Sequence, residues 1–331
     1  MTFSVIVLWA AGTSAPSCAE TVGKVYVTNQ GSDSVSVIDA GTLTVVATVS
    51  VGDVPHNVNH TPDNRWVLIT NKNVNVEAPP SVSIIDPRTD KVADVVNGIG
   101  SRIEHIVSTR PGVAYVTEDL GRNAVAILDL DGKRVSGFIP VGVKPHGLWA
   151  SPAGEWLFVP NQLSGTISKI NLANHQVVAE AAVGRTPTMA AVTPNGKSVY
   201  VTLFGERGVA VLNAELVESE RMQINDIIRV GERPAQVAVT PDGKYILVPC
   251  EGPGALFVIE EQTHEIIATI PTGRKAHGVD VSADGKLAFV SNWDDATLSV
   301  IDLSKMAVLK QIEIGASPAG VDFVLVDTAA N

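Results

Sequence analysis

The feature that most constrains this chain is a repeat of about 42 residues that continues along almost its entire length. Each copy is marked by a residue that stands four or five positions after a glycine and usually follows a proline. The marked positions are His56, His105, His146, Thr188, Ala235, His277 and Ala319, with steps of 49, 41, 42, 47, 42 and 42 residues. A period of about 40–45 residues with four strands per unit is typical of β-propeller blades. The chain is therefore predicted to be an all-β, seven-bladed propeller.

Each unit contains four strand-like stretches separated by short turns, which predicts four antiparallel strands per blade. The second stretches are Lys24–Thr28, Trp66–Thr70, Val113–Thr117, Trp156–Pro160, Ser198–Thr202, Tyr245–Pro249 and Leu287–Ser291. They are rich in Val, Ile, Tyr and Phe and alternate with a period of two, as strands do. Turns such as Pro241-Asp242-Gly243 supply the backbone angles that hairpins need.

The two ends of the chain are expected to share one blade. The first strand-like stretch, Lys24–Thr28, is a second strand, whereas the last one, Ser317–Val324, is an inner strand. Seven complete blades therefore require the C-terminal inner strand to pair with the N-terminal strands, which closes the ring and leaves no open sheet edge. We expect one propeller domain over residues 20–331, and a monomer.

Residues 1–19 have the pattern of an export signal. An apolar run over residues 3–10 is followed by small residues, and cleavage after Ala19 fits the small-x-small rule. The run is too short to span a membrane. No Lys or Arg precedes it, and lipid attachment at Cys18 is the alternative, although the preceding residues match a lipobox poorly. We therefore expect a periplasmic or secreted protein without a transmembrane span.

Composition excludes several classes of function. The net charge of −11 disfavours non-specific binding to nucleic acid, and 5% aromatic residues are too few for a base-stacking platform. Two cysteines do not make a disulfide-stapled scaffold. The sequence has no P-loop, no G-x-S-x-G and no C-x-x-C-H, so nucleotide hydrolysis of the P-loop type, α/β-hydrolase chemistry and covalent haem attachment are not indicated.

The segment Tyr-Val-Thr-Asn at 26–29, its echoes at 115–117 and 200–202, and the Ser-Val-Ile-Asp and Val-Gly-x-x-Pro-His segments resemble the YVTN family of seven-bladed propellers. The resemblance covers roughly residues 23–326. It implies the architecture and leaves the function open, because relatives and structural cousins include exported binding proteins, lactonases, haem d1-type cofactor-binding domains and copper oxidoreductases.

Four of the seven histidines occupy the marked repeat position, namely His56, His105, His146 and His277. In a propeller this position begins the inner strand, so the four side chains are expected to converge at one mouth of the central channel. Imidazole is a ligand of Cu, Zn, Fe and Ni. We predict that these histidines bind one transition metal, with copper favoured because Met189 and Cys250 are expected nearby. The alternative is that each histidine hydrogen-bonds to backbone across its blade.

The loops that lead to the marked positions are basic. They carry Arg102, Lys144, Arg185, Arg233, Arg274 and Lys275. The same loops carry three acidic residues, so their net charge is six minus three, or +3, whereas the net charge of the whole chain is −11. Such a rim is predicted to attract an anionic ligand or cofactor, the alternative being ordinary solvated charges.

Three further features are interpreted as structural. The third strands end in a polar residue, Asp, Asn or Glu, at one repeat position, where a short side chain accepts hydrogen bonds from the next turn. The remaining histidines, His60, His175 and His264, fall elsewhere in the repeat and are assigned to the surface or to packing. Cys250 is interpreted as a small buried apolar residue.

Three functional hypotheses remain open. The first is an exported propeller that binds a metal ion or an anionic ligand at the His-lined mouth. The second is an enzyme at the same mouth, either a metal-dependent oxidoreductase or a lactonase or lyase in which His105 and Glu118 of one blade act as acid and base. The third is an interaction scaffold for other envelope proteins.

Overall fold

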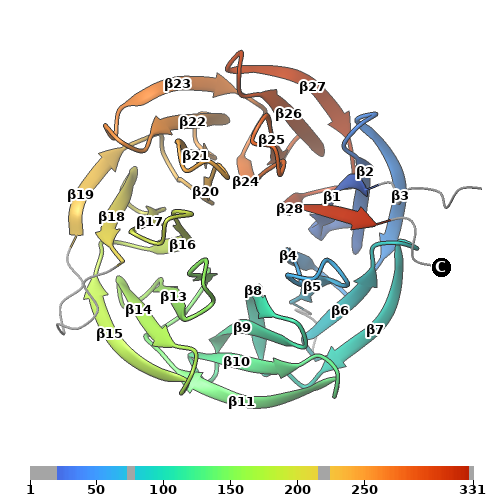
Figure 1. Cartoon of the computed structure of the whole chain (residues 1–331), viewed down its shortest axis with the longest axis vertical. Helices are drawn as coiled ribbons and strands as arrows, with labels where there is room; N and C mark the ends of the chain where they lie inside the picture. Colours follow the sequence, from blue (N-terminus) through green and yellow to red (C-terminus); the bar gives the residue numbers. More distant parts are fainter. Residues whose placement is uncertain (1–20, 73–78, 215–223, 328–331) are drawn as a thin grey trace, which may run out of the picture.

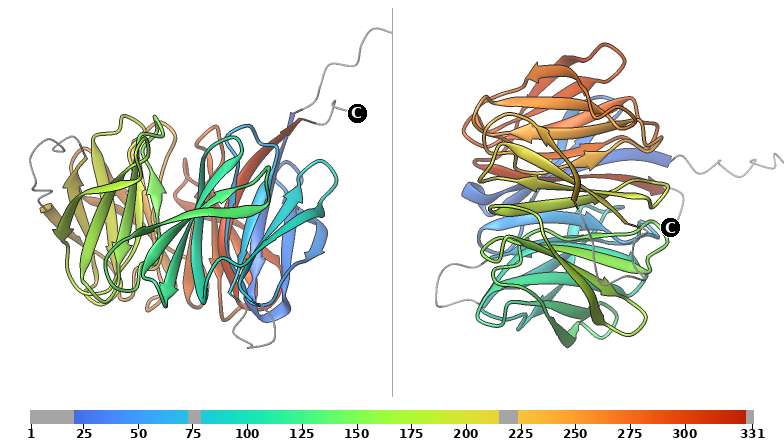
Figure 2. Two further views of the ribbon diagram at one scale, coloured as in Figure 1. Left: turned by 90° about the horizontal axis from the view of Figure 1, so that it is seen from below. Right: turned by 90° about the vertical axis from the view of Figure 1, so that its left-hand side faces the viewer.

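The computed structural model describes residues 21–72, 79–214 and 224–327, and the expected export signal lies outside them. The described residues form seven four-stranded antiparallel sheets arranged around a central axis (Figure 1). Seen from the side, the blades pack next to one another and together form a thick disc (Figure 2). Within the described residues, no helix is long and apolar enough to cross a membrane. The predicted seven-bladed all-β propeller is confirmed.

The blades follow the chain in order, and in the last six the inner strand comes first. The first blade contains β1 (Thr21–Asn29), β2 (Ser34–Asp39) and β3 (Thr44–Ser50), with β28 (Pro318–Asp327) as its inner strand. The second blade contains β4 (Pro55–His60), β5 (Val67–Asn71), β6 (Ser81–Asp86) and β7 (Lys91–Asn97). The third blade contains β8 (Arg102–Arg110), β9 (Val113–Leu120), β10 (Ala124–Asp129) and β11 (Arg134–Pro140). The fourth blade contains β12 (Trp149–Ala150), β13 (Trp156–Asn161), β14 (Thr166–Asn171) and β15 (Gln176–Ala182). The fifth blade contains β16 (Pro187–Val192), β17 (Ser198–Leu203), β18 (Gly208–Asn213) and β19 (Ile224–Arg229). The sixth blade contains β20 (Ala238–Val239), β21 (Tyr245–Cys250), β22 (Ala255–Glu260) and β23 (Ile266–Pro271). The seventh blade contains β24 (Ala276–Val281), β25 (Leu287–Asn292), β26 (Thr297–Asp302) and β27 (Ala307–Glu313).

The ring closes as the repeat count requires. Strand β28 pairs antiparallel with β1, with Val25 opposite Phe323 and Lys24 opposite Val324. The C-terminal strand is thus the inner strand of a blade whose other three strands come from the N-terminal part of the described chain. This pairing removes the open edge that a linear array of blades would leave.

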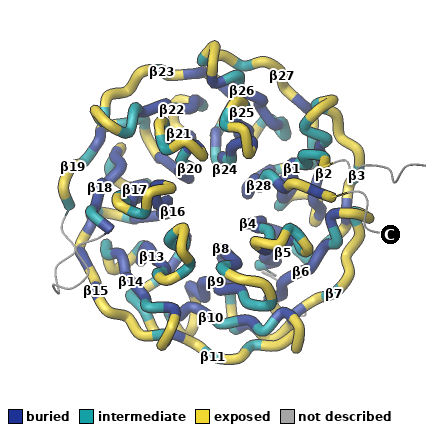
Figure 3. The backbone as a smooth tube through the Cα atoms, viewed as in Figure 1, coloured by how far each residue is buried: buried dark blue, intermediate teal, exposed yellow. Residues whose placement is uncertain are grey.

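The hydrophobic core lies between neighbouring blades. Strand side chains alternate between the two faces of a sheet, so each blade presents apolar residues to both neighbours. One such cluster joins Leu68 and Val82 of the second blade to Val116 and Ala126 of the third. Burial is concentrated on the inner and middle strands, whereas the outer strands are mostly exposed (Figure 3). The propeller therefore has seven interblade cores rather than one central core.

The threonine of the Tyr-Val-Thr-Asn motif connects adjacent blades at the marked position. The inner strand β4 shifts register between Pro55 and Val58, which leaves backbone groups there without a ladder partner. Thr70 on β5 accepts the Asn57 N–H (3.0 Å) and donates to the Glu104 carbonyl of the next blade (2.7 Å). Equivalent pairs of bonds are made by Thr28, Thr117, Thr202 and Ser291. The motif therefore fixes the backbone from which the marked side chains project.

The asparagine of the motif and the repeated glycine form a second structural unit. Asn71 donates to the hydroxyls of Ser81 and Ser83 on the third strand of its blade. Gly52 packs against the Asn71 side chain, where a Cβ atom would lie only 2.8 Å from the amide carbon. The same arrangement recurs for Gly142, Gly273 and Gly315 against Asn161, Asn292 and Asn29.

The polar residues at the third-strand ends are turn-capping residues, as the sequence indicated. Asp39 Oδ1 accepts the N–H groups of Gly41 (3.0 Å) and Thr42 (2.7 Å). Asp302 Oδ1 accepts the Ser304 N–H in the same way. These side chains stabilise the turn that leads to the outer strand.

Candidate functional site

The four histidines of the marked position lie together at one end of the propeller axis, which we call the histidine end. The ring centroids of His56 and His105 are 5.0 Å apart, and those of His105 and His146 are 4.9 Å apart. His56 is 5.7 Å from His146 and 6.2 Å from His277. His56 and His105 are almost completely buried. The convergence expected from the repeat position is therefore present in the structure.

Three of the rings present their nitrogens to a common point. One nitrogen from each of His56, His105 and His146 lies within 4.8 Å of the other two. Two nitrogens bound to one zinc ion at about 2.0–2.1 Å are at most about 4.2 Å apart. A small rotation of each ring, which moves its nitrogen inward by less than about 1 Å, would therefore let all three nitrogens reach one ion.

The ring nitrogens on the far sides are held by the protein. His146 Nδ1 lies 3.2 Å from the Thr188 carbonyl oxygen, to which a protonated Nδ1 donates, leaving Nε2 as a lone-pair donor. His56 Nδ1 contacts the Gln30 side-chain amide. Backbone or side-chain partners of this kind orient the imidazoles that bind metals. Within the described part of the chain, His105 Nδ1 is buried without a hydrogen-bond partner, and His56 Nε2 makes no hydrogen bond, although a carboxylate oxygen of Glu104 lies 3.2 Å from it.

Glu104 supplies a carboxylate to the same cluster. It is only 4% exposed, and its Oε2 lies 3.2 Å from His56 Nε2 and 3.7 Å from His146 Nε2. The Lys72 ammonium forms an ion pair with this oxygen, and Arg102 Nε lies 3.7 Å from Oε1. A buried carboxylate that faces two imidazoles and two cations is the charged centre of the histidine end.

His277 lies at the edge of the cluster and has its own carboxylate. Its Nδ1 is 2.9 Å from Glu251 Oε1, and its ring packs against Trp293 with centroids 5.4 Å apart. Arg233 binds the other oxygen of Glu251 at 2.6 Å. Burial alone would raise the pKa of Glu251, but the His277 hydrogen bond and the charges nearby lower it. His277 is thus oriented by Glu251 rather than by Glu104.

Burial favours the neutral form of the three central imidazoles. Burial, followed by the positive charge of Lys72, lowers the pKa of His56 and His146 well below its usual value. For His105, burial and then His146 lower the pKa in the same direction. Neutral imidazole, not imidazolium, is the form that binds metal ions.

Glu118 does not meet His105, although both belong to the third blade. Glu118 accepts the Ser101 N–H at 3.1 Å and pairs with Arg122 at 3.2 Å. Among the described residues, no hydrogen bond or ion pair joins it to His105. Glu118 occupies the motif's asparagine position, and there it holds its own loop.

Most cations of the predicted basic rim are paired. Their partners are Asp119 for Arg102 (2.6 Å), Glu206 for Arg185 (3.5 Å), Glu251 for Arg233 (2.6 Å), Asp295 for Arg274 (2.5 Å) and Asp294 for Lys275 (2.9 Å). Lys144 has no such ion pair within the described chain. Asp119 lies near the end of the second strand β9, and the other four carboxylates follow the second strands of their blades, outside the loops whose charge was counted in the sequence. They compensate most of the positive charge predicted for the rim.

Neither sulfur expected near the site belongs to the histidine cluster. Cys250 is fully buried in the apolar core between the fifth and sixth blades, and burial raises the pKa of its thiol to about 12. Met189 packs in the same core. The donors that converge at the histidine end are therefore nitrogens and oxygens.

Sequence reasoning missed the residues that complete the cluster. Glu104 directly precedes the marked residue His105, yet its charge was counted only as part of a loop. Glu251 directly follows Cys250 at a second-strand end. Lys72 likewise follows the motif asparagine of its blade. A tabulation of the residues that flank the two motif positions would have found all three.

Comparison with known proteins identifies the family. A family model described as YNCE-like beta-propeller matches residues 4–330. The chain belongs to this family. The Bacillus subtilis protein YwhL is 25% identical over 326 residues, which cover 95% of this chain and 68% of YwhL. Antigen Lp49 of Leptospira interrogans is 27% identical over 204 residues, 56% of this chain, and the match spans only 44% of the antigen.

Solved structures of low sequence identity share the architecture of this YNCE-like propeller. Hydrazine synthase of Kuenenia stuttgartiensis matches with a TM-score of 0.75 at 20% identity, covering 85% of this chain and 92% of that chain. A Bacteroides fragilis protein, provisionally assigned as a 6-phosphogluconolactonase, matches with a TM-score of 0.76 at 14% identity, covering 92% and 98%. At these identities the likeness concerns the fold alone.

Proposed function

We propose that this YNCE-like propeller binds one divalent transition-metal ion at the histidine end, through His56, His105 and His146 with the Glu104 carboxylate beside them. The observation that carries the proposal is the convergence of three imidazoles on one point, of which the buried His56 and His105 each have a ring nitrogen that makes no hydrogen bond within the described chain. A buried polar atom without a partner costs about 1–3 kcal/mol, and a bound cation would remove that cost for both nitrogens.

The donor set favours copper or zinc in the divalent state. Three imidazoles and a carboxylate suit either ion, and no cysteine of the described residues belongs to the cluster, which disfavours copper(I), an ion that prefers sulfur ligands. Divalent copper binds nitrogen and oxygen sites most tightly among first-row ions. Copper is therefore the ion we expect to bind with the highest affinity.

Lys72 suits a site that exchanges its cation. Its ammonium contacts the Glu104 oxygen that faces His56 and His146, so it balances the buried carboxylate when no metal is bound. A divalent ion near Glu104 would repel this ammonium and compete with it for the oxygen. Metal binding is accordingly expected to release Lys72 from Glu104.

The anionic-ligand hypothesis receives less support. A carboxylate stands at the centre of the cluster, and most rim cations are compensated by acidic partners. The acid–base pair of His105 and Glu118 has no supporting contact. Together with the export expected from residues 1–19, the metal site makes the protein a candidate metal-binding propeller of the periplasm or the secreted fraction.

The test is metal binding by protein purified without a histidine tag. Wild type is expected to bind one Cu²⁺ or Zn²⁺ in calorimetry, and the double variant His56→Asn/His146→Asn should lose at least about 100-fold in affinity, because outer-shell partners alone are worth 10–100-fold. His175→Gln is the matched control, since His175 contacts Tyr115 away from the cluster. Wild type without a stoichiometric site, or an equal loss in the control, contradicts the proposal.

A further inference from the structure

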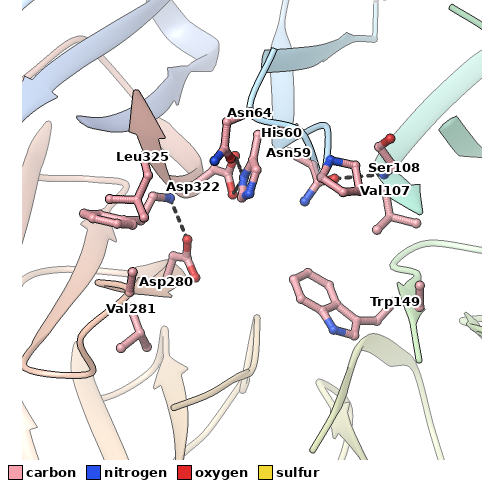
Figure 4. A pocket seen from close by; sticks show the side chains of 14 residues that line it. Asn59, His60, Asn64, Val107, Ser108, Trp149, Asp280, Val281, Asp322 and Leu325 are labelled. Atoms are coloured by element: carbon pink, nitrogen blue, oxygen red, sulfur yellow. Dashed lines mark hydrogen bonds and ion pairs between the residues drawn. The ribbon is translucent and has the colours of Figure 1, made fainter. Parts of the chain in front are cut away.

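The end of the axis opposite the histidines carries a second cluster, which we call the aspartate end. A cavity of about 520 Å³ opens there between the last residues of the inner strands (Figure 4). His60, Asp280, Asp322 and Trp149 line it, together with apolar residues such as Val107 and Val281 and a few smaller polar ones. Asp280, Asp322 and Trp149 each stand three residues beyond a marked position, so the propeller symmetry brings them to one level of the axis.

Negative charge is in excess in this cavity. His60 Nδ1 lies 2.9 and 3.1 Å from the two oxygens of Asp322, which is 5% exposed. Asp280 Oδ2 accepts the Phe323 N–H at 2.6 Å. His60 thus pairs with Asp322, and no ion pair joins Asp280 to a cation within the described residues. Burial and then Asp322 raise the pKa of Asp280 to about 7, against the opposing effect of His60, so the Asp280 carboxylate is insufficiently compensated.

Trp149 gives the cavity an aromatic wall. Its indole lies across the open space from Asp280 and Asp322 (Figure 4). An organic cation that sits between a carboxylate and an indole face gains attraction from both. An inorganic ion would gain little from the apolar area of the indole.

Deeper along the axis the cavity offers a hydrogen-bond donor. A smaller cavity of about 90 Å³ shares Asn59, Trp149, Asp280 and Asp322 with the outer one and is lined on its other side by Gln236. Gln236 is 6% exposed, and its Oε1 accepts the Val279 N–H at 3.4 Å. Its Nε2 has no partner within the described part of the chain. This buried donor is available to an acceptor atom on a ligand.

We propose that the aspartate end binds a small organic ammonium ion that also carries an oxygen acceptor. The ammonium group lies between Asp280, Asp322 and the face of Trp149, and the acceptor receives the Gln236 amide hydrogen. The proposal rests on none of the histidines at the other end, so it stands or fails independently of the metal site.

The chain itself suggests the variant that isolates charge from structure. Asn59 Oδ1 accepts the Ser108 N–H (2.9 Å) at the repeat position where Asp280 accepts the Phe323 N–H. Asp280→Asn can therefore keep the bond between the inner strands while it removes the negative charge. Loss of binding in this variant reports on charge rather than on a damaged blade.

The probes are choline and ethanolamine, with 3,3-dimethyl-1-butanol as the uncharged isostere of choline. Titration calorimetry at pH 8 should show millimolar or tighter binding of at least one ammonium probe and none of the isostere. Asp280→Asn should lower the affinity for the ammonium probe at least about tenfold, which corresponds to about 1.4 kcal/mol of binding free energy. Trp149→Leu should lower this affinity as well, and circular dichroism should verify that the variant is folded.

Four outcomes overturn the proposal. They are no binding of either ammonium probe by wild type, equal binding of the isostere, unchanged affinity in Asp280→Asn, and displacement of the probe by Ca²⁺ or K⁺ with no effect of Trp149→Leu. The last result would assign the carboxylates to an inorganic cation.

Discussion

The two ends of the propeller axis are built from the same seven inner strands, yet they differ in space and in charge. At the histidine end three imidazoles converge on one point, and the buried Glu104 carboxylate is balanced by Lys72 and Arg102. At the aspartate end a cavity of about 520 Å³ remains open, and Asp280 lies beside an Asp322 that is already paired with His60. The converging imidazoles suit a bare metal ion, and the open cavity suits a molecule.

The difference shows how a symmetric fold acquires two chemistries. Symmetry fixes which repeat position reaches which level of the axis, and the threonine bonds hold the inner strands at the level of the marked residues. The side chain at each level then decides the chemistry, because the backbone is nearly the same in every blade. The ends lie on separate levels without shared side chains, so their binding energies should be additive.

The largest expected effect is the complete separation of the two ends by substitution. His56→Asn/His146→Asn should remove at least about 100-fold of the Cu²⁺ affinity and leave choline binding unchanged, because no residue is shared. Asp280→Asn should give the reverse pattern. Parallel calorimetric titrations of the two variants with both ligands check this. If either variant impairs both ligands equally, the two ends are not independent sites.

The next effect concerns the carboxylate at the histidine end. Glu104→Gln should lower Cu²⁺ affinity by about 10–100-fold, since it removes the negative charge that faces His56 and His146. Glu118→Gln is the matched control, because Glu118 belongs to the same blade and, among the described residues, bonds its own loop and Arg122. Competition with a chromophoric chelator measures both. A Glu118 effect as large as that of Glu104 would contradict a specific role of Glu104 at the metal site.

A moderate effect is expected from pH at the aspartate end. Choline affinity should fall as the pH is lowered from 8 to 5, because Asp280, with a pKa raised to about 7 by burial and Asp322, takes up a proton. His60, the other charged group facing Asp280, has its pKa raised to about 9 by Asp322 despite its burial, so it stays charged over this range. Calorimetry across the range in wild type and Asp280→Asn should show a pH dependence only in wild type.

The smallest effect is on stability without ligand. The folded-state pKa of Asp280 is raised, so its stabilising contribution is present at pH 4 and is lost as the pH rises through about 7. Asp280→Asn should therefore flatten the fall in unfolding free energy between about pH 4 and 7, by at most about 1.4 kcal/mol per pH unit. Urea denaturation at each pH measures the slope. An unchanged slope would show that Asp280 ionises normally in the folded protein.

Much of the fold and part of the histidine end could be predicted from the repeat. The strand positions, the closure of the ring by β28 and β1, and the convergence of the four histidines all follow from placing each residue by its repeat position. The predictions for the rim were less informative, because carboxylates after the second strands meet the loop cations only once the hairpins are folded.

The residues that were missed lie next to the positions that were tabulated. Whether a neighbour such as Glu104 turns toward the axis depends on the local register shift of the inner strand, which the sequence pattern does not show. His60 was assigned to the surface or to packing, whereas it lines the cavity at the aspartate end beside Asp322. His175 and His264 do pack between blades, against Tyr115 and Tyr200.

The most direct test of the account is anomalous diffraction from crystals of the untagged protein soaked with Cu²⁺ or Zn²⁺ and choline. The account predicts one anomalous peak among His56, His105 and His146 beside Glu104, and choline density without a metal peak between Asp280 and Trp149. A metal peak at the aspartate end, or none at the histidine end, would contradict it.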